Sequence, residues 1–177
     1  MNKFILLFLS LTILCSSACV SLKPGASSGG KKLYETFYVG EEGTQYFIKP
    51  LRFSSAGEDY LDLDITFRYR DEVLDTATLN VSIYSTELFK EIDALTIQQN
   101  QFSATDEAVQ LMFVERDKGL NNCRYTAKLP LTELSELFTQ SDWEINIQKT
   151  GTPLVLEAPN KTQKKIGLLN YEIFKLF

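Results

Sequence analysis

Two neighbouring stretches of the chain alternate apolar and polar residues with a period of two, and this pattern constrains the fold more than any other feature. In residues 60–70, Leu, Ile, Phe and Tyr occupy one phase and Asp, Thr and Arg the other. Residues 76–85 repeat the pattern with Ala, Leu, Val and Ile. Period two is typical of a β-strand with one buried face. Because only residues 71–75 separate the stretches, they predict a β-hairpin.

Other segments also have the pattern of strands. Residues 107–115 and 122–129 predict a second hairpin, since Gly119 in the turn between them tolerates a positive φ. Pro50 has no amide hydrogen, so its strand is expected at a sheet edge or with a bulge. The remaining expected strands are residues 33–39, 44–53, 143–148 and 154–156.

Apolar residues at helical spacing interrupt the strands in three places. Residues 131–139 and 86–95 predict short helices, and residues 160–177 fit either a helix or a final strand. The whole pattern favours a mainly β fold, an antiparallel β-sandwich with one to three short helices. An immunoglobulin-like layout is one version of that fold. Residues 33–177 are expected to form a single β-rich domain.

The amino terminus has the three parts of an export signal. Lys3 makes the first residues basic, residues 4–14 are apolar except for Ser10 and Thr12, and small residues follow. Eleven residues rise only about 16 Å as a helix, which is too short to span about 30 Å of hydrocarbon. We therefore expect residues 1–18 to be a cleaved signal peptide.

The sequence Ser16-Ser17-Ala18-Cys19 resembles the lipobox of bacterial lipoprotein precursors. The resemblance implies that Cys19 carries the lipid and that cleavage falls between Ala18 and Cys19. The chain departs from that family at Ser16, where Leu is usual. A simple secretory cut after Ala18, giving a soluble periplasmic or secreted protein, is the alternative, because Ser16 and Ala18 also satisfy the small-x-small rule.

Residues 19–32 are expected to be the lipidated Cys and a flexible tether, because Pro, Gly and Ser dominate the stretch after Cys19. The expected partner is therefore a membrane, reached through the acyl chains on Cys19. Val20, rather than Asp, follows Cys19, which by the sorting rule of some Gram-negative bacteria implies the outer membrane. Cys15 would leave with the signal, so that Cys123 would be the one thiol of the mature domain. Its position on an apolar strand phase predicts a buried, inert side chain.

Composition excludes several functions. The chain has no histidine, which rules out histidine-dependent triads, general bases and zinc sites. Its formal net charge is -5, and loss of Lys3 with the signal makes the mature chain about one unit more negative, so nucleic acid is not an expected partner. No glycine-rich phosphate loop lies between a strand and a helix, and no cofactor or metal is expected.

Paired carboxylates are the remaining route to catalysis. Asp62 and Asp64 share one strand face, and Glu41 and Glu42 occupy a turn, so a carboxylate-dependent hydrolase or a calcium site is an alternative. Solvated strand faces ordinarily carry such residues, so no catalytic residue is assigned.

Aromatic residues supply candidates for carbohydrate binding, which needs exposed rings. Tyr34, Phe37, Tyr38 and Tyr84 are these candidates, whereas Trp143 follows a core phase. Asp75-Thr76-Ala77 resembles an O-glycosylation motif of exported proteins in some envelope bacteria. Asn80-Val81-Ser82 and Asn160-Lys161-Thr162 match the eukaryotic N-glycosylation pattern.

We expect a lipid-anchored lipoprotein of the cell envelope. Its β-domain would bind or scaffold a partner and would not be catalytic. The partner would be an envelope protein or polysaccharide. One alternative is a carbohydrate- or protein-binding accessory of an outer-membrane uptake or assembly complex, which would carry exposed aromatic side chains on one sheet or at one loop end.

Overall fold

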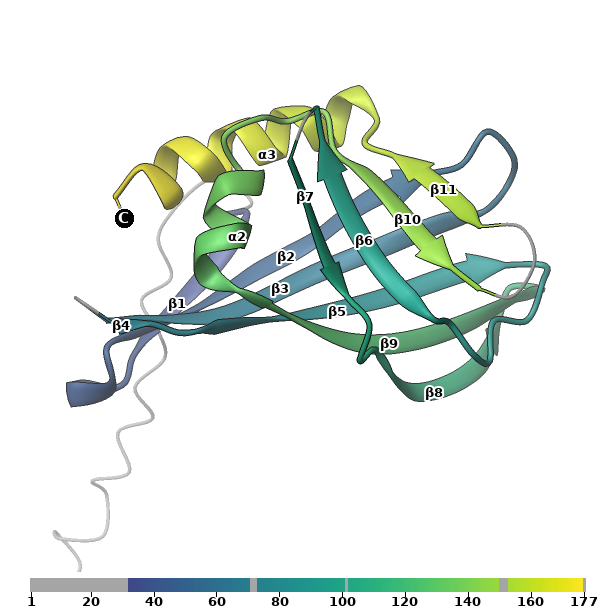
Figure 1. Ribbon diagram of the computed structural model, residues 1–177, viewed down its shortest axis with the longest axis horizontal. Helices are drawn as coiled ribbons and strands as arrows, with labels where there is room; N and C mark the ends of the chain where they lie inside the picture. The colour runs from purple at the N-terminus through teal and green to yellow at the C-terminus, as the bar shows by residue number, and fades with distance from the viewer. Residues whose placement is uncertain (1–31, 71–72, 101, 150–152, 177) are drawn as a thin grey trace, which may run out of the picture. The chain divides into compact units, whose positions relative to one another are not determined.

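A computed structural model describes residues 32–70, 73–100, 102–149 and 153–176 (Figure 1). These residues form a mainly β domain with two α-helices. The elements are β1 (Tyr34–Tyr38), η1 (Gly40–Glu42), β2 (Thr44–Ser54), β3 (Tyr60–Arg70), β4 (Val73–Leu74), β5 (Thr76–Ser85), β6 (Ala94–Gln99), β7 (Phe102–Asp106), β8 (Gln110–Asp117), β9 (Leu120–Pro130), α2 (Leu131–Leu137), β10 (Glu144–Gln148), β11 (Leu154–Glu157), α3 (Asn160–Glu172) and η2 (Phe174–Leu176).

The described strands belong to one antiparallel sheet in the order β7-β6-β10-β11-β2-β3-β5-β9-β8, with β1 paired to β2 and β4 to β3. The sheet curls, so that β6, β7, β10 and β11 lie across β2, β3, β5 and β9 (Figure 1). The curl brings β7 back to β9, where the Lys128 amide donates a hydrogen bond of 2.7 Å to Asp106 Oδ2. The two layers of the sandwich are therefore halves of one continuous sheet, which differs from the two separate sheets of an immunoglobulin domain.

The alternating stretches form the strands that they predict. β3 and β5 pair in register, with Leu63 opposite Val81 and Ile65 opposite Leu79, and all four side chains are buried. β8 and β9 form the second expected hairpin, with Lys118 and Gly119 at positive φ in its turn. Pro50 falls where the register of β2 against β3 shifts between Ile48 and Leu51, which confirms the expected bulge.

The core is a single cluster of buried side chains between the two halves of the sheet. Trp143 is fully buried as expected, and its ring lies 6.4 Å from Phe53 and 4.7 Å from Phe138, centroid to centroid. Its Nε1 donates a hydrogen bond of 2.8 Å to the carbonyl of Leu137 in α2, so the largest core side chain has its polar atom satisfied.

Both helices cover the core with their apolar sides. Residues 160–177 begin with the helix α3, which settles the choice between helix and strand for that stretch. α3 buries Ile166 and Leu169, and Thr162 Oγ1 donates a hydrogen bond of 2.6 Å to the carbonyl of Arg52 in β2. No helix of the described residues combines the length and apolar character needed to cross a bilayer.

The prediction of a helix at residues 86–95 is wrong. Those residues run irregularly from β5 into β6, and the Glu87 amide bonds to Ser85 Oγ at 3.0 Å instead of to a helical carbonyl. Phe89 and Leu95 are buried but Leu88 is exposed, so the apolar residues do not share one helical side. The alternation in the sequence also fails to reveal β6 and β7, because Gln, Asn, Ser and Thr occupy most positions from 96 to 105.

Candidate functional site

The turn between β1 and β2 builds the candidate site, and two glycines shape it. Gly40 and Gly43 adopt φ of 62° and 88°, and the Val39 amide closes the turn on the Gly43 carbonyl at 2.8 Å. A Cβ on Gly43 would lie 2.2 Å from the carbonyl oxygen of Tyr69. Only glycine therefore lets this turn pack directly against the end of β3.

Three tyrosines line an open groove beside this turn. Tyr38 and Tyr69 both lie in register with Thr44 of β2, and Tyr46 is two residues further along the same face. The cavity has a volume of about 490 Å³, and Gly40, Glu41, Gly43 and Arg70 complete its lining. Tyr38 is 80% exposed, so its ring is open to a ligand.

The tyrosines continue an aromatic row that starts in the core. Tyr46 stacks on the buried ring of Phe67 with centroids 5.0 Å apart, and Tyr34 lies 6.3 Å from Tyr46. Burial raises the pKa of Tyr46, and the neighbouring hydroxyls of Tyr34 and Tyr69 raise it further. Burial first, and then the charge of Glu172, also raise the pKa of Tyr34. These phenols are therefore neutral hydrogen-bonding groups at physiological pH.

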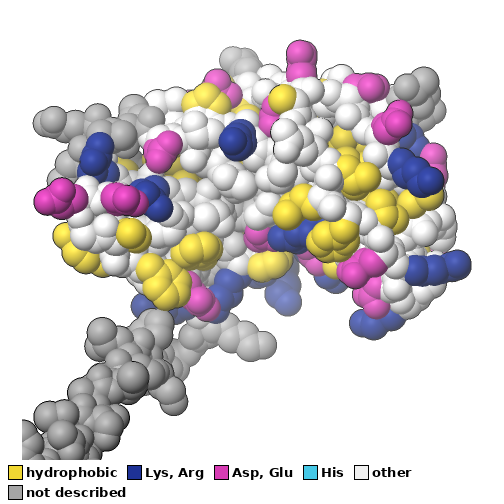
Figure 2. Space-filling view, turned by 90° about the horizontal axis from the view of Figure 1, so that it is seen from below, with side chains coloured by type: hydrophobic (Ala, Val, Ile, Leu, Met, Phe, Trp, Pro, Cys, Tyr) yellow, Lys and Arg dark blue, Asp and Glu magenta, His cyan; other side chains and the backbone are white. Residues whose placement is uncertain are grey.

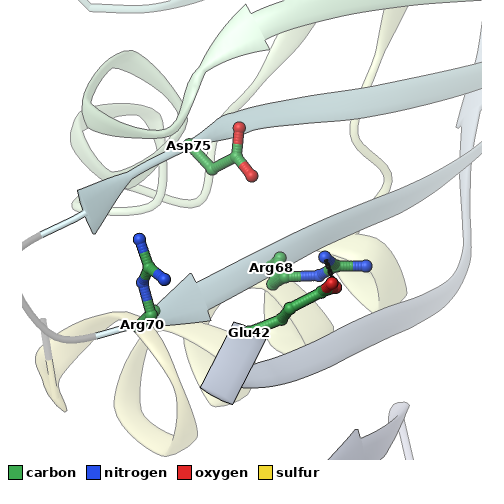
Figure 3. Close-up of a pocket in the computed structure, with 4 residues that line it drawn as sticks. All are labelled: Glu42, Arg68, Arg70 and Asp75. Atoms are coloured by element: carbon green, nitrogen blue, oxygen red, sulfur yellow. Dashed lines mark hydrogen bonds and ion pairs between the residues drawn. The ribbon is translucent and has the colours of Figure 1, made fainter. Parts of the chain in front are cut away.

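A smaller polar pocket of about 150 Å³ on the outer face of β3 is lined by Glu42, Arg68, Arg70 and Asp75 (Figure 3). Arg68 forms an ion pair with Glu42, and its Nε donates to Gln45 Oε1 at 3.2 Å. The side chains of Arg70 and Asp75 point into the space between them (Figure 3). Asp75 Oδ1 accepts a hydrogen bond of 2.8 Å from the Thr76 amide.

Arg70 lines both cavities and has fewer contacts than the neighbouring Arg68. Its Nη1 donates a hydrogen bond of 3.4 Å to the Glu41 carbonyl, and no carboxylate among the described residues forms an ion pair with it. Arg68 is instead held by Glu42. The groove offers aromatic rings, hydroxyls and the Arg70 guanidinium, and among the described residues the smaller pocket on the other face of β3 shares only Arg70 with it.

A scan against models of protein families found no match. Searches of curated proteins and of solved structures also found no similar protein. The function must therefore be inferred from this chain's own residues.

The structure brings one of the predicted aromatic residues into the groove. Tyr38 lines it, whereas the Phe37 ring lies on the other face of the sheet against Phe47, with centroids 5.5 Å apart. Tyr84 stacks face to face on Tyr60 at 4.5 Å, and Arg52 covers the Tyr60 ring at 4.3 Å. Both faces of the Tyr60 ring and one face of the Tyr84 ring are therefore occupied, as in a cross-strand pair of the fold.

The predicted carboxylates are placed as partners of arginines. Asp62 and Asp64 share the outer face of β3 as expected, and their oxygens lie 2.6 Å from Arg52 Nη2 and 2.8 Å from Arg124 Nη2. Asp64 also accepts a hydrogen bond of 3.0 Å from Asn80 Nδ2. Among the residues that the structure describes, no three His, Cys, Asp or Glu side chains cluster as metal ligands would.

The remaining predicted sites fall in two groups. Ala18, Cys19 and the whole of residues 1–31, with the expected signal, cleavage site and most of the tether, lie outside the described residues. Cys123 lies on the core-facing side of β9 and is 1% exposed. Burial raises the pKa of its thiol.

The modification motifs differ in accessibility. Thr76 is exposed at the start of β5, and Asn160 is exposed at the start of α3. Asn80 instead bonds to Asp64 at 3.0 Å, and Ser82 is buried.

The alternation in the sequence does not single out Tyr46 or Tyr69 as site residues. Each lies on the apolar phase of its strand, where an aromatic residue ordinarily belongs to the core. The pairing register of β1, β2 and β3 would have identified them, because it places Tyr46 and Tyr69 at the end of the sheet beside Tyr38.

Proposed function

We propose that this chain is a lipid-anchored protein of a bacterial cell envelope whose β-domain binds carbohydrate in the groove between β1, β2 and β3. The observation that carries the carbohydrate assignment is the open groove that Tyr38, Tyr46 and Tyr69 line, with Arg70 beside them. Its proposed role is to bind and hold its ligand rather than to convert it.

The chemistry of the groove fits a chain of sugars. An aromatic ring offers an apolar face for the C–H side of a pyranose, and polar groups at the rim satisfy the hydroxyls. The exposed Tyr38 ring supplies the first kind of contact. The Arg70 guanidinium and the tyrosine hydroxyls that line the groove supply donors and acceptors for the second.

The open form of the site favours a polymer over a small molecule. A groove of about 490 Å³ with three tyrosines along it accepts an extended ligand at several successive positions. A polysaccharide offers repeated contacts, each of which adds to the affinity. An envelope protein with an extended segment is the second candidate, because exposed tyrosine and arginine also favour protein interfaces.

The binding experiment is co-sedimentation of the mature chain with insoluble polysaccharides: cellulose, xylan, chitin and peptidoglycan sacculi. Tyr38→Ala and Arg70→Ala should each raise the dissociation constant, obtained from the bound fraction at increasing polysaccharide, by about tenfold or more, the effect of losing one good polar or stacking contact. Tyr171→Ala is the matched control, because Tyr171 is 70% exposed on α3. An equal loss of binding in Tyr171→Ala, or no binding of the wild-type chain to any of these polysaccharides, would contradict carbohydrate binding at this groove.

The proposed anchor has an independent test. The Ser16-to-Cys19 sequence supports cleavage before Cys19, and mass spectrometry of the mature protein from a bacterial host should find a diacylglyceryl group on that residue. Cys19→Ala should move the protein from the membrane fraction to the soluble fraction. An unmodified mature Cys19, or a different amino terminus, would contradict the anchor and leave the groove proposal intact.

A further inference from the structure

Charge is distributed unevenly along the chain. Residues 33–159 contain ten Lys and Arg against 22 Asp and Glu. Residues 160–177, which include α3, instead contain four Lys and one Glu, and residues 20–32 contain three Lys and no acidic residue. The helix α3 and the stretch that leads into β1 are therefore basic parts of an acidic chain. Such an asymmetry indicates that the basic parts have an anionic partner.

The lysines of the carboxyl-terminal segment lie on the outer side of α3 and η2. Lys161, Lys164 and Lys175 are exposed, and Lys165 is half-buried, with its Nζ donating a hydrogen bond of 3.4 Å to the carbonyl of Pro50. No carboxylate among the described residues forms an ion pair with any of these four lysines. Their positive charges are therefore not neutralised within that part of the chain.

The opposite side of the domain has a different distribution of charge. α3 lies at the top of Figure 1, and the side seen from below mixes Lys and Arg side chains with those of Asp and Glu (Figure 2). On the outer face of β2, β3 and β9, Arg52, Arg68 and Arg124 each form an ion pair with a carboxylate. Opposite charges compensate each other there, whereas α3 carries a net positive charge.

Apolar groups lie among the lysines of α3. Leu168 is 51% exposed and Tyr171 is 70% exposed, and a spacing of three residues places them on the same side of the helix. Lys164 precedes Leu168 by one turn, and Lys175 Nζ lies 5.6 Å from the centroid of the Tyr171 ring. We call Lys161, Lys164, Leu168, Tyr171 and Lys175 the α3 stripe.

We propose that the α3 stripe binds the surface of a bilayer that contains anionic phospholipids. The ammonium groups would contact lipid phosphates, and Leu168 and Tyr171 would enter the headgroup region, where aromatic and apolar side chains are stable. An acidic polymer in water would attract the same lysines but would offer no apolar region to Leu168. The combination of charge and apolar surface therefore favours a bilayer over such a polymer.

The place where the chain enters the domain also supports a bilayer. Burial, and then the charge of Glu172 at the end of α3, raise the pKa of Tyr34 at the start of β1, so α3 ends near the first described residues. The 13 residues from Val20 to Lys32 span at most about 45 Å. A lipid on Cys19 would hold the stripe within reach of the same membrane. This support rests on the proposed anchor, whereas the charges and the exposed side chains do not.

Vesicle binding without an acyl group tests the stripe by itself. The mature chain with Cys19→Ala, which cannot be acylated there, is sedimented with vesicles of phosphatidylcholine alone or of phosphatidylcholine mixed with phosphatidylglycerol. Binding should be at least about tenfold stronger when phosphatidylglycerol is present, and it should weaken as salt rises, because salt screens the attraction. Absence of binding to the phosphatidylglycerol vesicles at low salt would refute the proposal.

The lysines have a matched control on another strand. In the same background, Lys161→Ala and Lys164→Ala should each lower the vesicle partition coefficient about fivefold, the contribution of one lysine at an anionic surface. Lys128→Ala should leave it unchanged, because Lys128 is exposed on the outer face of β9. Circular dichroism verifies that each variant is folded. An equal loss in Lys128→Ala would show that only the overall charge matters and would overturn the assignment to α3.

The apolar members of the stripe separate this proposal from carbohydrate binding. Leu168→Ala and Tyr171→Ala should each lower vesicle binding about threefold or more, because carbon atoms are lost from the lipid interface. Tyr38→Ala should bind vesicles as the unsubstituted chain does, although it is expected to lose polysaccharide. Failure of the groove and failure of the stripe are therefore distinguishable.

Fluorescence quenching shows whether the stripe enters the lipid. The native Trp143 is 1% exposed in the core, so lipid does not reach it. The emission that Tyr171→Trp adds should be quenched by phosphatidylglycerol with acyl chains brominated near the headgroup, and the emission that Lys128→Trp adds should not. Equally tight binding to soluble polyglutamate, with no quenching at position 171, would assign the lysines to an acidic polymer and overturn the proposal.

Discussion

The hydroxyl of Tyr125 donates a hydrogen bond of 2.8 Å to the carbonyl oxygen of Phe89, joining the centre of β9 to the irregular segment between β5 and β6. Both residues are buried, so the bond satisfies a carbonyl that water does not reach. It explains how a non-helical segment is tolerated against the core, because buried backbone groups must find partners.

Tyr125→Phe should destabilise the domain, because it removes this donor and leaves the Phe89 carbonyl unsatisfied. We expect a loss of about 1–3 kcal/mol in the free energy of unfolding. Urea denaturation of the wild-type and variant domains measures the difference. Tyr171→Phe, at an exposed site, should change stability by less than about 0.5 kcal/mol. Equal stabilities of the wild type and Tyr125→Phe would show that the bond does not matter to folding.

Stability should also fall in strong alkali. Burial raises the pKa of Tyr125 from 10.0 to about 12, with smaller contributions from the charges of Cys123 and Glu91. Between these values the unfolded chain loses the phenolic proton and the folded chain keeps it, so the contribution is complete below pH 10 and is lost as pH rises towards 12. Absorbance of tyrosinate should show a late-titrating phenol, which Tyr125→Phe removes. Simultaneous titration of all the tyrosines near pH 10 would contradict this.

The pair formed by Arg124 and Asp64 should contribute more than a surface ion pair. Arg124 Nη1 also donates to Ser82 Oγ at 2.7 Å, so one guanidinium joins β9, β5 and β3. A double-mutant cycle with Arg124→Ala and Asp64→Ala should give a coupling of about 1–2 kcal/mol, since both side chains are largely buried.

The matched control for this cycle is the exposed pair of Lys49 and Glu35, in which Lys49 Nζ lies 3.1 Å from Glu35 Oε1. Solvent and salt screen such a pair, so its coupling should be at most about 0.5 kcal/mol. Equal couplings for the two pairs would mean that burial does not strengthen the contact between Arg124 and Asp64.

Gly43→Ala should disrupt the turn that shapes the groove. The new Cβ would meet the Tyr69 carbonyl at 2.2 Å, and φ is 88°, so backbone strain and steric overlap add. We expect a loss of at least about 2 kcal/mol in the free energy of unfolding, together with weaker ligand binding. Gly40→Ala separates the two effects, because φ is 62° but nothing lies within 4 Å of its Cβ. Thermal denaturation compares the variants, and Gly40→Ala should lose only about 1 kcal/mol.

Local pattern predicted much of the secondary structure. β3 and β5 begin and end at the residues where the alternation does, and the bulge follows from the missing amide hydrogen of Pro50. The sequence pattern did not predict β6 and β7, where polar residues fill both strand phases. It predicted a helix wrongly at 86–95, where apolar residues fit helical spacing by chance. In those places burial by distant strands decides the conformation.

The candidate site shows the same division. Tyr38 was identifiable as an exposed aromatic residue, but its neighbours Tyr46 and Tyr69 come from two other strands. Conversely, Tyr84 was expected to be available, and only the pairing with Tyr60 places a ring against its face. Exposure of an aromatic residue depends on cross-strand partners, which its own strand does not reveal.

The sequence by itself determined the strands whose residues alternate cleanly, such as β3 and β5, because period two is a local property of the backbone. It also determined the absence of histidine chemistry. Only the tertiary structure decided the strand order, the approach of β7 to β9 at Asp106 and Lys128, and the groove at the end of β1. Those features depend on which distant strands exchange backbone hydrogen bonds, and the same alternation is compatible with many such pairings.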